Sequence, residues 1–63
     1  MKNNNLYNLM TQLTQESRSL WRIKNEYSKD AKDKELKVFW KELAAEKEAL
    51  VEDLKLIIKA ELE

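Results

Sequence analysis

The 63-residue chain contains no cysteine, histidine, glycine or proline. Without Cys and His it has no disulfides, thiol nucleophiles, zinc fingers or imidazole acid–base chemistry. Without Gly and Pro it has no glycine loop for phosphates, and a hairpin-rich β fold is disfavoured. No run of ~18 apolar residues is present, and the opening Met-Lys-Asn-Asn-Asn lacks the apolar stretch of a signal peptide. We therefore expect a soluble, cytoplasmic protein with no membrane partner and no cofactor.

The residues that remain are 38% charged and 43% hydrophobic, which is typical of long amphipathic helices. Residues 1–29 carry five basic and two acidic side chains, whereas residues 30–63 carry seven and ten. The formal net charge is zero, so no overall field attracts nucleic acid or an anionic membrane.

Two segments repeat apolar residues at spacings of three and four, which predicts helices over residues ~4–28 and ~33–62. The first series is Leu6, Leu9, Leu13, Leu20, Ile23 and Tyr27, and the second is Leu36, Phe39, Trp40, Leu43, Leu50, Leu54, Ile57, Ile58 and Leu62. The polar stretch between them predicts a short turn, whose Ser and Asp residues are candidate N-caps for the second helix.

An antiparallel pairing centred near residue 31 brings apolar residues together in layer after layer. The expected layers are Leu6 with Ile57, Leu13 with Leu50, Leu20 with Leu43, Ile23 with Trp40, and Tyr27 with Leu36. Because two independent series agree in register, we predict an all-α fold, with residues 1–63 forming a single helical-hairpin domain.

The apolar arcs are wider than two helices can bury, because a two-stranded seam covers only two positions in seven. Trp21, Trp40, Val51 and Ile58 are expected to remain on the surface and to require a partner. The simplest partner is a second copy, which gives a homodimeric four-helix bundle. The residues expected to carry core and dimer packing are Leu13, Leu20, Trp21, Trp40, Leu43, Leu50 and Leu54.

One layer of the predicted hairpin is polar, because the same register places Glu16 opposite Lys47. A buried ion pair there would add little stability but would fix the alignment of the helices. The alternative is that Lys47 extends along its alkyl stem to water and that Glu16 also leans outward.

Two segments carry a resemblance to a known family: Glu-Ser-Arg-Ser-Leu-Trp-Arg at 16–22 and Lys-Glu-Leu-Lys-Val-Phe-Trp-Lys-Glu-Leu-Ala-Ala-Glu-Lys-Glu-Ala-Leu-Val-Glu-Asp-Leu at 34–54. They resemble the first and second helices of the ferritin-like and rubrerythrin-like superfamily, and the resemblance covers nearly the whole chain. The second segment is most similar to an uncharacterised bacterial branch of that superfamily. The resemblance implies a two-helix half-bundle.

The metal ligands of that superfamily are largely missing from this chain. The resemblance implies a first-helix Glu, matched by Glu16, and a second-helix Glu-x-x-His, which aligns with Lys47 and Leu50. A shift of one residue restores a carboxylate at Glu46 but brings Ala49, not His. Lysine at a ligand position opposes cation binding, so we expect no metal site, although oxygen-only binding by Glu16 and Glu46 across a dimer is conceivable.

The sequence offers no catalytic residues, and we expect a non-enzymatic protein–protein interaction module. One alternative is a nucleic-acid-binding regulator that uses a basic strip of Arg18, Arg22 and Lys29, against the interpretation of that strip as an ordinary solvated face. A third possibility is a degenerate metal-binding ferritin-like protein.

Overall fold

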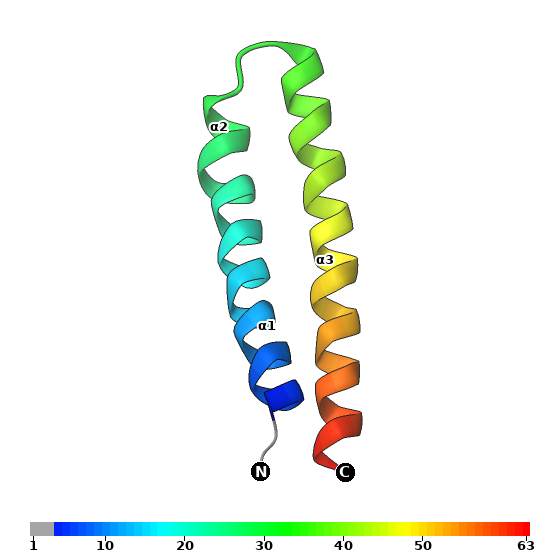
Figure 1. Ribbon diagram of the computed structural model, residues 1–63. Coiled ribbons are helices and arrows are strands. Elements are labelled where there is room, and N and C mark those ends of the chain that lie inside the picture. Colours follow the sequence, from blue (N-terminus) through cyan, green and yellow to red (C-terminus); the bar gives the residue numbers. More distant parts are fainter. Residues whose placement is uncertain (1–3) are drawn as a thin grey trace.

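The protein is a helical hairpin in the computed structural model, which describes residues 4–63 (Figure 1). Helix α1 spans Asn4–Arg22 and continues without a break through the π-helix Ile23–Tyr27 and the short α2, Ser28–Asp30. After a turn, α3 spans Lys34–Leu62 and runs back alongside this first arm. The prediction of two helices and no strands is confirmed for the described residues, with the arm ending two residues later than expected.

The turn is built without glycine because its residues use extended backbone at negative φ. Ala31 has φ −66° and ψ 126°, and its N–H donates to the carbonyl of Tyr27 at 3.1 Å. Asp33 has φ −100° and ψ 161°, and its carboxylate accepts a hydrogen bond of 2.8 Å from the N–H of Leu36. This bond satisfies one of the free donors at the start of α3. The prediction of an aspartate N-cap is confirmed at Asp33.

The π-helix changes which residues of the first arm face α3. Its hydrogen bond from the Ser28 N–H to the Ile23 carbonyl spans five residues, so the turn holds one residue more than an α-turn. Ile23, the most buried residue described, lies at its start. After Ile23, Ser28 is half-buried and Ala31 is buried, whereas Tyr27 is exposed. The added residue keeps the charged Asp30, seven residues after Ile23, out of the next core-facing position.

The buried line of α3 consists of Ala44, Val51, Leu54 and Ile58. We call this line, with the half-buried Trp40 and Lys47, the α3 seam. The prediction that Leu50 and Ile57 face the core is wrong, because they are 41% and 48% exposed. The prediction that Val51 and Ile58 remain on the surface is also wrong. Both series are apolar and differ by about 100° around the helix, so the centre of the arc was misplaced by one residue.

Near the turn, Tyr27 packs against Trp40, a partner that the predicted register did not give it, with ring centroids 5.0 Å apart. Side chains on a helix tilt toward its N-terminus. In an antiparallel pair, Tyr27 therefore leans away from the turn and Trp40 leans toward it, so the rings meet although their backbones lie at different levels. Leu36 is left exposed.

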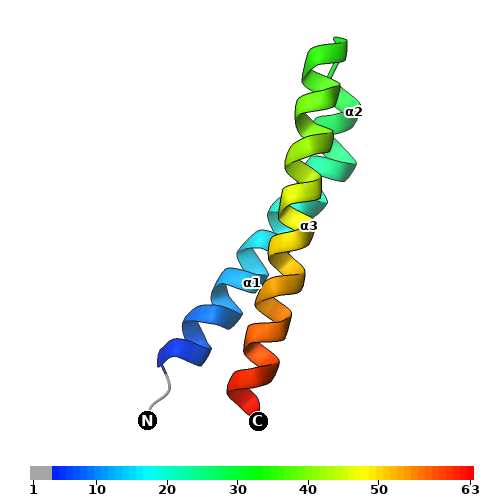
Figure 2. The same ribbon diagram turned by 90° about the vertical axis from the view of Figure 1, so that its right-hand side faces the viewer.

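The hairpin is long and thin, measuring 49 × 14 × 12 Å. Its radius of gyration of 14.5 Å exceeds the about 11 Å of a compact chain of this length. Figure 2 shows that the first half of α1 leans away from the C-terminal half of α3. The accessible surface is 5064 Å², about 800 Å² more than a compact monomer of this mass exposes. The elongated hairpin therefore exposes more surface than a compact chain of this mass.

Candidate functional site

The polar layer of the hairpin is an ion pair between the two long helices. Lys47 Nζ donates to Glu16 Oε1 at 2.6 Å, and the two side chains are only 24% and 13% exposed. The other carboxylate oxygen, Oε2, accepts a 2.7 Å hydrogen bond from the Gln12 amide one turn earlier on α1. The structure thus pairs the two residues that the antiparallel register places in one layer, and it holds both oxygens of Glu16.

This environment lowers the pKa of the Glu16 carboxyl. The hydrogen bond from Lys47 is the largest cause, and partial burial opposes it by disfavouring the charged form. The hydrogen bond from Gln12 and the charge of Lys47 lower the pKa further. Glu16 is therefore ionised at neutral pH and is held in one geometry.

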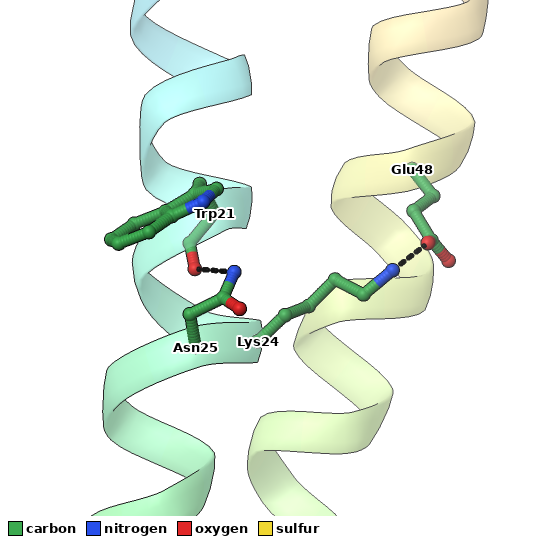
Figure 3. A network of polar contacts seen from close by, with 4 residues as sticks. All are labelled: Trp21, Lys24, Asn25 and Glu48. Carbon is green, nitrogen blue, oxygen red and sulfur yellow. Dashed lines mark hydrogen bonds and ion pairs between the residues drawn. The ribbon is translucent and has the colours of Figure 1, made fainter.

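A second ion pair joins the helices at the edge of the hairpin. Lys24 Nζ lies 2.9 Å from Glu48 Oε2, with about half of each side chain exposed (Figure 3). In the same stretch, the Asn25 side-chain amide donates to the Trp21 carbonyl at 2.9 Å. The Trp21 ring points away from α3 (Figure 3). Because it is so exposed, the Lys24–Glu48 pair contributes little to stability.

The larger exposed apolar surface lies on α3, beside the seam. We call it the α3 stripe, and its residues are Leu36, Phe39, Leu43, Leu50 and Ile57. All of these side chains are exposed except Leu43, which is half-buried. Four of the five recur every seven residues, so they follow a single line along the helix. The hairpin itself does not cover this line.

A smaller apolar surface lies on α1, where Tyr7, Met10 and Trp21 are all more than half exposed. Met10 and Lys24 share one strip of the first arm, since they are fourteen residues apart. That strip lies at the edge where Lys24 bonds to Glu48. On α3, Glu48 and Leu50 fall on opposite sides of the seam because they are about 200° apart around the helix. The two apolar surfaces thus face opposite sides of the hairpin.

The other residues expected to pack are divided between the core and these surfaces. Leu54 is buried, and Leu13, Leu20 and Trp40 are half-buried between the arms. Trp21 is 57% exposed and takes no part in the hairpin core. Trp21 therefore remains on the surface as predicted, whereas Trp40, which was expected to remain there too, is half-buried.

The basic strip is exposed and does not form a continuous line. The described part of the chain forms three ion pairs, and none of them involves Arg18, Arg22 or Lys29. The π-helix between Arg22 and Lys29 adds one residue, which displaces Lys29 by about 100° from the line of the two arginines. The sequence had indicated that the three cations share one face of the helix. In the structure they do not.

The layer that the ferritin-like resemblance aligns with metal ligands contains a lysine ammonium bonded to a carboxylate. Within residues 4–63, no three His, Cys, Asp or Glu side chains come together in a way that could hold a metal ion. None of the described helices is long and apolar enough to cross a membrane. Comparison with known proteins gives no match among family models, curated sequences or solved structures.

Proposed function

We propose that this protein is a small non-enzymatic interaction module that associates with itself, forming a homodimer of two hairpins arranged as four helices. The observation that carries this proposal is the imbalance between buried and exposed apolar side chains. Among residues 4–63, eleven large hydrophobic side chains are more than a third exposed, whereas six residues are buried, two of them alanine. A core of this size rarely stabilises a chain of this length by more than about 3–5 kcal/mol.

The hairpin exposes about 800 Å² more surface than a compact monomer of its mass. A standard interface buries about 800 Å² on each partner, so dimerisation would bring the exposed area of each chain close to that of a compact monomer. A contiguous exposed apolar surface on a small protein is typical of an interaction site. The ion pair between Glu16 and Lys47 would keep the two helices of each hairpin aligned while this surface is in contact with a partner.

Light scattering over a wide range of protein concentrations, with helicity followed by circular dichroism, tests the proposal. We expect a stable species of twice the 7.5 kDa chain mass that is helical throughout. A monomer at every concentration would contradict self-association. If that monomer were also weakly helical, a different protein would be needed to complete the fold.

A further inference from the structure

Four of the five residues of the α3 stripe are symmetric about a point between Glu46 and Lys47, and Phe39 is the exception because its mirror position, Leu54, is buried. Leu43 and Leu50 are equally far from this point, and so are Leu36 and Ile57. At the point itself lies a shallow open depression lined by Leu43, Glu46, Lys47 and Leu50. Four residues at this spacing form the kind of hole into which a side chain of a facing helix inserts.

We infer that a second copy of this chain occupies the α3 stripe, with its own α3 antiparallel to the first and a two-fold axis near Glu46 and Lys47. This inference rests on the proposed self-association and specifies its interface. Leu43 of each copy would pack near Leu50 of the other, and Leu36 near Ile57. Four apolar layers would then be buried along the two α3 helices, with the first arms side by side on one flank.

The symmetry of the stripe favours a second copy over any other occupant. In a two-fold interface the same surface meets itself, so residue i contacts j and residue j contacts i. The spacing of Leu36, Leu43, Leu50 and Ile57 meets this condition with leucine or isoleucine in each layer. The smaller surface at Tyr7, Met10 and Trp21 faces the other side of the hairpin, and its spacings of three and eleven residues are not symmetric.

A charged residue next to the α3 stripe opposes the pairing, and its substitution should change dimerisation in a defined direction. Glu46 is exposed beside the axis, so the two copies would bring their Glu46 carboxylates near each other. Like charges at such a distance destabilise an interface at low salt. Glu46→Gln should therefore tighten dimerisation at low salt and have little effect at high salt. A weaker dimer in this variant would overturn the inference.

Cysteine cross-linking tests the geometry directly, because the natural chain contains no cysteine. Glu46→Cys should form a disulfide-linked dimer on mild oxidation, since position 46 lies next to the axis. The matched control is Ala45→Cys, which is exposed but lies about 100° further around α3 and should remain monomeric on a denaturing gel. Circular dichroism would verify that both variants keep their helices.

The direction of the helices is tested at the ends of the stripe. Leu36→Cys and Ile57→Cys should not cross-link when each is oxidised alone. In the antiparallel arrangement, position 36 of one copy is about 30 Å from position 36 of the other, and the same holds for position 57. A mixture of the two variants should cross-link. Cross-linking of either variant with itself would indicate parallel helices and would overturn the inference.

A substitution in the stripe separates this inference from the proposal on which it rests. Leu50→Lys should raise the dissociation constant of the dimer at least about tenfold, equivalent to about 1.4 kcal/mol. Leu56→Lys, an equally apolar but more exposed position off the stripe, should leave the constant unchanged. A dimer that tolerates Leu50→Lys and does not cross-link at position 46 would overturn the interface only. A monomeric natural chain would overturn both.

Discussion

Lys47 and Glu16 form an ion pair of 2.6 Å between α1 and α3, and it is the least exposed of the ion pairs in the described chain. Their positions in the sequence are 31 residues apart, so the contact exists only when the hairpin is closed. Both oxygens of Glu16 accept hydrogen bonds, one from Lys47 and one from Gln12. Loss of either charge would leave a polar group between two apolar layers without its partner.

The first prediction concerns the strength of this pair. Glu16→Gln should lower the free energy of unfolding by about 1–3 kcal/mol, because the ammonium of Lys47 keeps its partial burial but loses its counter-ion. Urea denaturation at neutral pH measures the change. Glu48→Gln is the matched control, since it removes the exposed Lys24–Glu48 pair and should cost less than about 1 kcal/mol. Equal losses in the two variants would contradict a special role for the partly buried pair.

The second prediction concerns pH. The pKa of Glu16 is lower in the folded chain than in the unfolded one, so the unfolded state binds a proton first as the pH falls. The stabilisation from Glu16 is therefore complete above the ordinary glutamate pKa of about 4.3 and is lost at lower pH. The stability difference between the natural chain and Glu16→Gln should shrink from about pH 5 to pH 3. A difference that stays constant over this range would contradict the shift.

The third prediction concerns the start of the π-helix. Ile23 is 1% exposed, so Ile23→Ala should leave a cavity between the arms and lower the free energy of unfolding by about 2–4 kcal/mol. Chemical denaturation followed by circular dichroism measures this loss. Leu56→Ala, which removes a side chain that is 66% exposed, should change the stability by less than about 0.5 kcal/mol. If the two substitutions had similar effects, Ile23 would not be a core residue.

The fourth prediction separates the interaction module from the nucleic-acid alternative. Because Lys29 is displaced from Arg18 and Arg22 by the π-helix, we expect no salt-sensitive binding to RNA or DNA. A mobility-shift assay at low and moderate salt measures this. A shift that salt abolishes, and that is lost in the double variant Arg18→Ala and Arg22→Ala, would instead favour the regulator. The double variant should dimerise like the natural chain.

The pattern of apolar residues was sufficient to predict both helices and the turn between them. Spacings of three and four over many turns are compatible only with helix, and a run of polar residues without apolar periodicity marks the break. The Ser and Asp residues of the polar stretch could be predicted as candidate N-caps, and Asp33 is the one whose carboxylate reaches the third backbone N–H after it. The layer of Glu16 and Lys47 followed from the antiparallel register alone.

The centre of the buried face on α3 could not be fixed in the same way. Leu43 and Ala44, Leu50 and Val51, and Ile57 and Ile58 are adjacent pairs of apolar residues, so two lines around the helix are almost equally hydrophobic. The interpretation chose the line with the larger side chains. In the structure the line that includes Ala44 and Val51 faces α1, leaving the larger residues at the side. The position of Lys47 could have identified the correct line, because Lys47 was predicted to face Glu16. Trp40 and Leu54 lie seven residues before and after Lys47, on the same side of the helix.

The π-helix had no sequence signal that we could identify. Its residues, Ile23–Tyr27, are ordinary helix residues, and the heptad spacing runs through them to Tyr27 without a break. The π-helix changes which residues pack against α3, because Ala31 is buried after it and Asp30 is exposed. Tertiary packing of this kind is decided between helices and not by the propensity of one segment.

Both ends of the described segment lie at one pole of a rod 49 Å long, and the turn lies at the other (Figure 1). Any label or domain joined to either end of the hairpin would therefore leave from the same pole. In a pair with antiparallel α3 helices, the turn of one copy would lie beside the chain ends of the other. Such an assembly would present attachment points at both of its poles, and so it could hold two attached groups apart as a spacer.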